Sequence, residues 1–271
     1  MKLVRFGAAG QEKPGLIDAA GNVRDLSGVI TDLTADQLSD EALSRLARLD
    51  PGSLPAVPGQ PRFGVPVAHV GKYVAIGINY TEHAEEAGLR IPKEPVVFMK
   101  AVTCLCGAAD SLILPKGSVK TDWEIELGVI IGKKTRYVAQ EDALAHVAGY
   151  CVANDVSERE FQIERGTQWD KGKGCDTFGP VGPWLVTRDE ISDPQNLDMF
   201  LDVNGVRMQT GNTRSMIFPV AHIVSYLSHF MTLLPGDVIA TGTPPGVGLA
   251  RRPQVFLKPG DTVRAGIAGL G

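Results

Sequence analysis

Cysteine is scarce in this sequence. Four cysteines occur among 271 residues, and they form no set of CxxC pairs. This argues against a disulfide framework in a chain of this length. Cys104 and Cys106 have the spacing of half a soft-metal site, but no second Cys/His pair lies near them. We therefore interpret the cysteines as buried thiols. They are Cys104, Cys106, Cys151 and Cys175.

Long apolar runs and an excess of basic residues are missing as well. No stretch approaches the roughly 20 apolar residues of a membrane span, and the polar start Met1–Phe6 does not resemble a signal peptide. We therefore expect a cytoplasmic protein without a membrane partner. The formal net charge is −4 and no basic run occurs, so we expect no nucleic-acid partner.

Glycine and proline are abundant, with 31 and 18 residues. Many turns and short strands follow from this, which favours a β-rich fold over a helical bundle. Residues 1–65 predict a small N-terminal α/β domain, with a strand at 2–6, a turn at Pro14-Gly15, a hairpin at 15–22 and a helix at 36–49. The stretch 51–66 holds five prolines and three glycines, and we interpret it as the linker to a main domain at 66–271.

The main domain shows short apolar segments separated by Gly/Pro turns. Asn204-Gly205, between two valines, is typical of a two-residue hairpin. The pattern predicts strands at 74–77, 96–99, 124–131, 148–153, 184–186, 199–203, 237–240 and 261–264, and helices at 82–87, 141–146, 157–165 and 220–230.

Acidic and apolar residues alternate at the start of the segment 122–131. Side chains two residues apart share a strand face, so Asp122, Glu124 and Glu126 are expected on one side. The apolar continuation predicts burial, where like charges are costly unless a cation binds them. Carboxylate oxygens suit Mg²⁺, Mn²⁺ or Ca²⁺. Asp155, at the end of the apolar run 147–153, offers a third ligand; the alternative is a solvated strand face.

His83 and Glu86 are neighbours on one face of the predicted helix at 82–87. A carboxylate beside an imidazole orients the ring and raises its basicity, as a general base requires. The alternative is a surface histidine without a role. Thr243 lies in a glycine-rich segment that lacks the pattern of a phosphate-binding loop. Its hydroxyl and the neighbouring amides could hold a carboxylate.

The polar composition of the segment 168–174 predicts a flexible loop that carries Lys173. Arg159 and Gln162 lie upstream of this loop. One divalent ion on three carboxylates keeps a net negative charge, so an anionic substrate would need further cations. Lys173 and Arg159 could supply them. The alternative is a solvated surface loop.

Together these residues resemble the fumarylacetoacetate hydrolase family over about residues 70–271. The matching motifs follow the family's order, which makes the match more specific than any single motif. They are Ile76-Gly77-Ile78-Asn79-Tyr80 with His83, Asp122-Trp123-Glu124-Ile125-Glu126-Leu127, Gly149-Tyr150 with Asn154-Asp155-Val156-Ser157, Lys173 with Asp176-Thr177-Phe178-Gly179-Pro180, Val203-Asn204-Gly205, and Pro235-Gly236-Asp237 with Thr241-Gly242-Thr243-Pro244.

The resemblance implies an α+β, β-rich fold, namely a mixed β-roll or sandwich catalytic domain behind a small N-terminal domain, and a homodimer. It implies Mg²⁺ or Mn²⁺, with Ca²⁺ as a possible substitute, on Glu124, Glu126 and Asp155. It places His83 and Glu86 on a segment that orders over a small 2-oxo acid substrate. The substrate-binding residues that it implies are Lys173, Arg159, Gln162 and Thr243.

The expected reaction is hydrolysis of the C3–C4 bond of a 2,4-dioxo acid. The first substrate candidate is 2,4-diketo-3-deoxy-L-rhamnonate or the corresponding fuconate, which would give pyruvate and lactate. The alternatives are a ureidoglycolate lyase, an isomerase/decarboxylase, an acylpyruvate hydrolase, and a catalytically silent metal- or ligand-binding relative.

Overall fold

A ten-stranded mixed sheet forms the centre of the computed structural model, which describes residues 1–271. The order along the sheet is β3-β2-β1-β11-β9-β8-β14-β4-β5, and β6 pairs with β11. Its strands are β1 (Lys2–Phe6), β2 (Lys13–Ile17), β3 (Val23–Asp25), β4 (Tyr73–Gly77), β5 (Val96–Lys100), β6 (Leu105–Gly107), β8 (Ile125–Ile131), β9 (Val147–Asn154), β11 (Gly179–Thr187) and β14 (Val238–Ala240).

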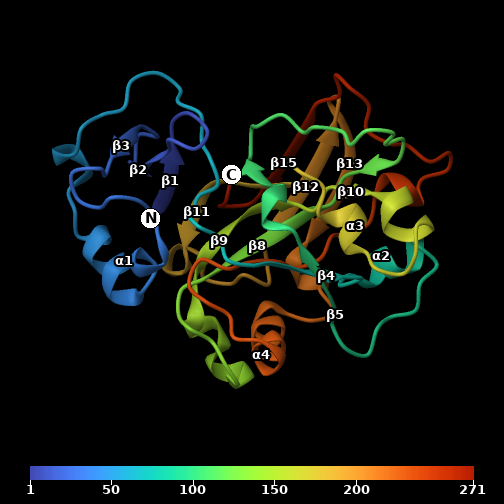
Figure 1. Cartoon of the computed structure of the whole chain (residues 1–271). Helices are drawn as coiled ribbons and strands as arrows, with labels where there is room; N and C mark the ends of the chain where they lie inside the picture. Colours follow the sequence, from blue (N-terminus) through green and yellow to red (C-terminus); the bar gives the residue numbers. More distant parts are fainter.

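Two small sheets and four short α-helices complete the fold (Figure 1). One sheet has the order β13-β12-β15, and the other pairs β7 with β10. The predicted β-rich mixed class is confirmed. These elements are β7 (Thr121–Asp122), β10 (Ser157–Glu158), β12 (Asp198–Val203), β13 (Val206–Asn212), β15 (Val263–Ile267), α1 (Asp40–Ala47), α2 (Thr81–Glu86), α3 (Asp170–Lys173) and α4 (Val220–Phe230).

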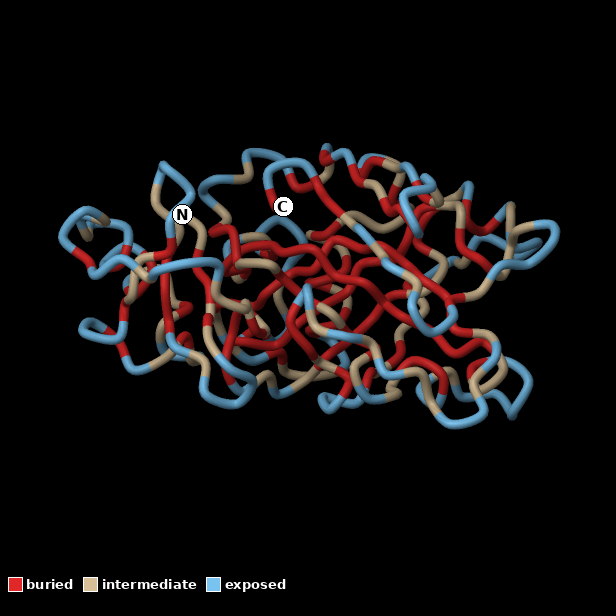
Figure 2. Tube along the Cα trace, turned by 90° about the horizontal axis from the view of Figure 1, so that it is seen from above, coloured by how far each residue is buried: buried red, intermediate tan, exposed pale blue.

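The central strand β8 is buried on both faces. Val129 packs in a core that includes Leu201 of β12 and Leu227 of α4. Ile130 packs on the other face, in a core that includes Leu46 of α1. This explains the continuous apolar run after Glu126, since neither face of this strand meets water. Buried segments run through the middle of the molecule, and exposed loops lie around them (Figure 2).

The N-terminal segment continues the main sheet. β1 pairs antiparallel with β11, with Leu3 opposite Leu185. In Figure 1 the blue segment of β1–β3 and α1 lies beside β11. A domain boundary at residue 65 stays a prediction. No helix of the fold has both the length and the apolar character that a membrane span needs.

Several local predictions were wrong. Pro14 and Gly15 lie inside β2 and do not form a turn. Gly15 is needed there for packing, because a Cβ would lie 3.0 Å from the Phe6 ring and from the Arg24 carbonyl oxygen. The predicted helix at 157–165 begins as strand β10 and continues as a π-helix at Glu160–Glu164. The helix at 141–146 is a 3-10 helix (Gln140–His146).

Candidate metal centre and active site

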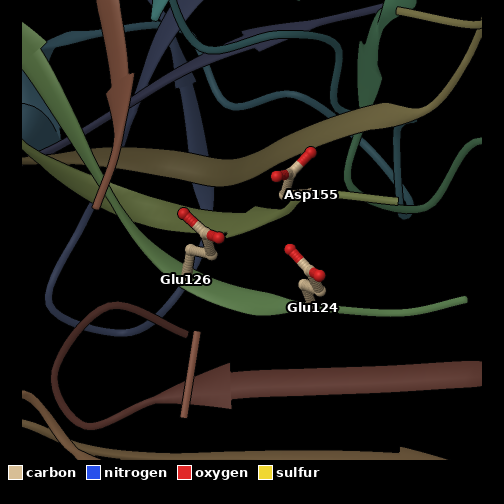
Figure 3. A group of neighbouring side chains, drawn as sticks. All are labelled: Glu124, Glu126 and Asp155. Atoms are coloured by element: carbon tan, nitrogen blue, oxygen red, sulfur yellow. The ribbon is translucent and has the colours of Figure 1, made fainter. Parts of the chain in front are cut away.

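Three carboxylates meet where β8 begins and β9 ends. Glu126 is the second residue of β8, Glu124 precedes that strand, and Asp155 follows β9. The antiparallel register sets Ile125 opposite Asn154, and the Asp155 amide donates to the Glu124 carbonyl oxygen over 2.8 Å. Figure 3 shows the three side chains pointing into one space. One oxygen from each lies within 4.8 Å of the others, and all three residues are buried.

Two of these carboxylates are held by buried cations. Lys173 Nζ lies 2.7 Å from Glu124 Oε2 and 2.6 Å from Asp155 Oδ2. Lys100 Nζ lies 2.5 Å from Asp155 Oδ1, and an Arg159 guanidinium nitrogen lies 2.7 Å from Glu124 Oε1. Burial opposes charge on Lys173, but Asp155 and Glu124 together raise its pKa. The ammonium therefore stays charged between the two acids.

Glu126 differs, because it has no cationic partner. Its side chain accepts only from the Gly242 amide, over 2.7 Å, although the residue is just 1% exposed. Burial, with added repulsion from Asp155 and Glu124, raises the pKa of Glu126 well above its usual range. Burial also acts on Glu124, but there Lys173 and Arg159 prevail and hold its pKa far below the usual range.

This imbalance fits a divalent cation. With Asp122, four buried carboxylates face three buried cationic side chains, Lys100, Lys173 and Arg159. With all four carboxyl groups ionised the cluster would carry one net negative charge, which costs free energy in a buried site and is the reason the pKa of Glu126 is raised. One divalent ion would turn this into one net positive charge, and three carboxylate oxygens are the hard ligands that Mg²⁺ or Mn²⁺ takes. The donor set therefore fits the metal that the sequence predicted.

Asp122 is not part of the oxygen cluster. Its carboxylate accepts from the amides of Gly248 and Leu249, over 2.7 and 2.9 Å, and from Arg159 Nε over 2.8 Å. Asp122, Glu124 and Glu126 were expected on one strand face. That face is interrupted, because the chain is not in a strand between β7 and β8. Asp122 instead links the loop after residue 247 to Arg159, which in turn holds Glu124.

His83 is buried and is oriented by a carboxylate. Its Nδ1 lies 2.8 Å from Glu86 Oε1, and the residue is 8% exposed. The Gly246 amide donates to Glu86 Oε1 and Oε2 over 3.0 and 2.9 Å. The carboxylate is thus fixed from a distant loop, and it fixes the ring. An imidazole held in this way has the arrangement of a general base.

The predicted substrate residues line one cavity of about 480 Å³. Its wall includes two of the three acids, Glu124 and Glu126, but not Asp155. The wall also includes His83, Glu86, Lys173, Arg159, Gln162 and Thr243.

These residues differ in what they can still offer a ligand. Arg159 donates to Asp122 and Gln162, and its second terminal nitrogen lies 2.7 Å from Glu124 Oε1 as an ion pair without a hydrogen bond. Gln162 accepts from Arg159 through Oε1 and keeps its amide hydrogens free. The Thr243 hydroxyl donates to the Ile125 carbonyl oxygen over 2.8 Å and accepts from Gln209 over 2.8 Å.

The segment 168–174 is not the flexible loop that its composition suggests. Residues 170–173 form α3, and Lys173 is 2% exposed. Gly172 allows the helix to approach closely, because a Cβ there would lie 2.4 Å from the Glu158 carbonyl oxygen. Trp169 stands at the cavity wall and packs its ring edge-on against Phe98, with the centroids 5.5 Å apart.

Lys100 is a site residue that the sequence did not reveal. It ends the apolar strand β5 and is buried. Its ammonium contacts Asp155 and the carbonyl oxygens of Val156 and Lys173. A lysine closing an otherwise apolar strand was the available signal, since a buried ammonium needs an acid.

Comparison with known proteins places this site in a family. Residues 72–271 match the family model described as fumarylacetoacetate (FAA) hydrolase C-terminal. A Burkholderia cenocepacia protein, provisionally named a hydrolase, is 63% identical over 100% of this chain and 96% of its own.

Two solved structures from other bacteria share the fold. Maleylpyruvate hydrolase from Sphingobium sp. SYK-6, in complex with manganese(II) and pyruvate, has a TM-score of 0.82 and 31% identity, covering 100% of this chain and 96% of its own. A 2-hydroxyhepta-2,4-diene-1,7-dioate isomerase from Mycobacterium marinum has a TM-score of 0.76 and 32% identity, covering 100% and 95%. The chain belongs to the fumarylacetoacetate hydrolase family.

Proposed function

We propose that the protein hydrolyses the C3–C4 bond of a 2,4-dioxo acid with the help of Mg²⁺ or Mn²⁺. The observation that carries this is a buried trio of carboxylates, one of them without a cationic partner; two of the three line the same cavity as a carboxylate-oriented histidine. The manganese and pyruvate bound to the similar maleylpyruvate hydrolase support both the type of ion and the type of product.

In this proposal Glu124, Glu126 and Asp155 hold the ion, which when bound supplies a Lewis acid that stabilises negative charge on the 2-oxo end of the substrate. His83 takes a proton from the water that attacks the C4 carbonyl, and Glu86 keeps the ring in place.

Around the substrate, the Gln162 amide hydrogens and the third hydrogen of the Lys173 ammonium bind the carboxylate. Few neutral hydrogen-bond donors line this wall, so Lys173 provides most of the stabilisation of the negative charge on the substrate. Arg159 acts mainly by holding Glu124 in an ion pair, since two of its nitrogens donate to Asp122 and Gln162.

Several acyl groups remain candidates. The sugar-derived 2,4-diketo-3-deoxy-L-rhamnonate or fuconate, split into pyruvate and lactate, is the first. An isomerase/decarboxylase activity is the second, and the isomerase of similar structure supports its isomerisation step. Ureidoglycolate lyase, acylpyruvate hydrolase and a silent ligand-binding role are further alternatives.

We expect the purified protein to release pyruvate from at least one 2,4-dioxo acid. A coupled pyruvate assay over sugar-derived dioxo acids, acylpyruvates and ureidoglycolate measures this. A chelator should abolish release, and Mg²⁺ or Mn²⁺ should restore it, because the trio then regains its ion. Glyoxylate from ureidoglycolate without pyruvate from any dioxo acid would refute the proposal, as would turnover that survives complete metal removal.

The Gly246 turn should be essential for positioning Glu86. Gly246 has φ +107°, and a Cβ there would lie 2.1 Å from the Met208 carbonyl oxygen. We expect Gly246→Ala to lower the free energy of unfolding by roughly 2 kcal/mol. The rate of pyruvate release should fall at least about tenfold, because the amide of residue 246 would no longer donate to Glu86. Thermal unfolding and the pyruvate assay measure both effects.

Gly260→Ala is a matched control for this variant. Gly260 also has a positive φ, +91°, but nothing lies within 4 Å of the added Cβ. It should lose stability through backbone strain alone and keep its turnover. Equal activity losses in the two variants would argue against the role of Gly246.

We also propose that the protein is cytoplasmic, as its composition led us to expect, and a homodimer, as the family resemblance implies. Sedimentation velocity on the purified chain tests the dimer, and a monomer at micromolar concentration would refute it.

A further inference from the structure

Asn79 is a fully buried side chain with no direct part in the proposed reaction. It lies between β4 and α2, the helix that carries His83, and it does not line the cavity. Its Nδ2 donates to the Thr241 and Phe218 carbonyl oxygens over 2.7 and 3.0 Å, and its Oδ1 accepts from the Phe218 amide over 2.8 Å. Because a buried amide group is costly unless it is hydrogen-bonded, these bonds hold the side chain in one place.

The Thr241 oxygen that Asn79 holds belongs to the same peptide unit as the Gly242 amide. A peptide unit is planar and trans, so its C=O and N–H groups point in opposite directions. Asn79 lies at the oxygen end, and at the other end the N–H donates to Glu126 Oε2 over 2.7 Å. This N–H is the only group that donates to the Glu126 side chain. The hydrogen bond from Asn79 therefore sets the direction of the donor that Glu126 receives.

The peptide unit would be less fixed without this contact, because a glycine follows it. Gly242 has φ +97°, and a Cβ there would lie 2.5 Å from the Asn79 Cβ, so the close approach requires glycine. Glycine also lets the preceding peptide plane turn more freely than another residue would. The Thr241 hydroxyl donates to the Leu127 carbonyl oxygen over 2.9 Å, which holds that side chain but not the plane of the next peptide. A turned plane would point the Thr241 oxygen at the Glu126 carboxylate, where two acceptors repel each other.

We propose that Asn79 is a positioning residue for Glu126: it aims the Gly242 amide at the carboxylate and so holds this ligand in the orientation in which it meets the ion. This deepens the proposed function and rests on it for the role of Glu126 as a metal ligand. Hydrogen bonds to the ligands of a metal orient them and tune their affinity. Glu124 and Asp155 are also held by lysine and arginine side chains, whereas Glu126 has only this amide.

Asn79→Leu tests this role, because leucine has nearly the same size and forms no side-chain hydrogen bond. Titration with Mn²⁺, followed by electron paramagnetic resonance, should show binding roughly tenfold weaker than in the wild type, because a partner of a metal ligand loses its support. This readout does not depend on turnover. The smaller change Asn79→Ser should also weaken Mn²⁺ binding, since the serine hydroxyl lies one bond closer to the backbone than Nδ2 and falls short of the Thr241 oxygen. It keeps the test decisive where the leucine variant does not fold.

Asn212→Leu is the matched control. Asn212 is also a buried asparagine, and its side chain bonds to residues that neither hold the ion nor line the cavity, namely Asn196, Asp198 and Arg214. The variant should lower the midpoint of thermal unfolding and keep the Mn²⁺ affinity within about twofold, because its contacts lie apart from the trio. Equal losses of Mn²⁺ affinity in the two leucine variants would overturn the positioning role.

Hydrogen exchange of the Gly242 amide separates this inference from the proposed reaction. In metal-free protein labelled with [¹⁵N]glycine, NMR should show exchange of this amide roughly tenfold faster in Asn79→Leu than in the wild type, the factor that corresponds to one lost hydrogen bond. Asn212→Leu should leave it unchanged. Faster exchange together with a wild type that binds no Mn²⁺ would refute the metal-dependent reaction and keep the control of this amide by Asn79. Unchanged exchange in Asn79→Leu, or Mn²⁺ bound there as tightly as in a wild type that does bind it, would overturn the inference.

Discussion

Glu126→Gln is expected to abolish metal binding and to lower pyruvate release on the order of 10³-fold. Glutamine keeps the size of the side chain and an oxygen that accepts from the Gly242 amide, so the turn at Gly242 survives. What is lost is the one carboxylate of the trio that no lysine or arginine neutralises. Titration with Mn²⁺, followed by electron paramagnetic resonance, measures the affinity, and the coupled assay measures turnover.

The same variant should gain stability in the absence of metal. It removes a carboxyl group that has no cationic partner in an almost fully buried site, where burial raises the pKa of the group because ionising it there costs folding free energy. Asp237→Asn is a suitable contrast. Asp237 is also buried, but Lys72 Nζ lies 2.5 Å away and the Lys72 and Leu234 amides donate to it. That variant should lose stability and keep its metal affinity. A Glu126→Gln protein that binds Mn²⁺ as tightly as the wild type would contradict the assigned ligand set.

Much of the fold could be predicted because strand signals here are local. The apolar runs of β8 and β9 and the Asn204-Gly205 hairpin lie where the pattern placed them. The failure at Pro14-Gly15 has a physical cause. This pair usually signals a turn, yet Gly15 is there because the Phe6 ring and the Arg24 backbone leave no room for a side chain. Such crowding depends on strand pairing, which a single sequence does not reveal.

The site was also partly predictable, because part of its signal is local in the sequence. Glu124 and Glu126 are two residues apart, and that spacing alone predicts a shared face. Asp155 reaches them through the register of β8 against β9; its place at the end of the apolar run 147–153 suggested a ligand, and the motif order strengthened that prediction. Lys100 escaped notice because its partner Asp155 lies 55 residues later in the chain. The same holds for the Gly246 amide, which meets Glu86 across 160 residues.

His83→Ala should lower kcat for pyruvate release by about 10²–10⁴-fold, the usual contribution of a positioned general base. Its KM and its Mn²⁺ affinity should change little, because no contact joins His83 to Glu124, Glu126 or Asp155 in the hydrogen-bonded network. Glu86→Gln should have a smaller effect, on the order of tenfold, since it weakens the orientation of the ring and leaves the base in place.

A base and a merely structural histidine can be told apart by rescue. The ring of His83 borders the cavity, so its removal leaves space beside the attacking water. Added imidazole should then restore part of kcat in His83→Ala, in proportion to its free-base concentration, and should do nothing for Glu126→Gln, which lacks a ligand and not a base. Full hydrolysis by His83→Ala without imidazole would remove the proposed base. Loss of Mn²⁺ affinity in that variant would instead show that His83 supports the metal cluster, so kinetics and metal titration must be measured on the same preparation.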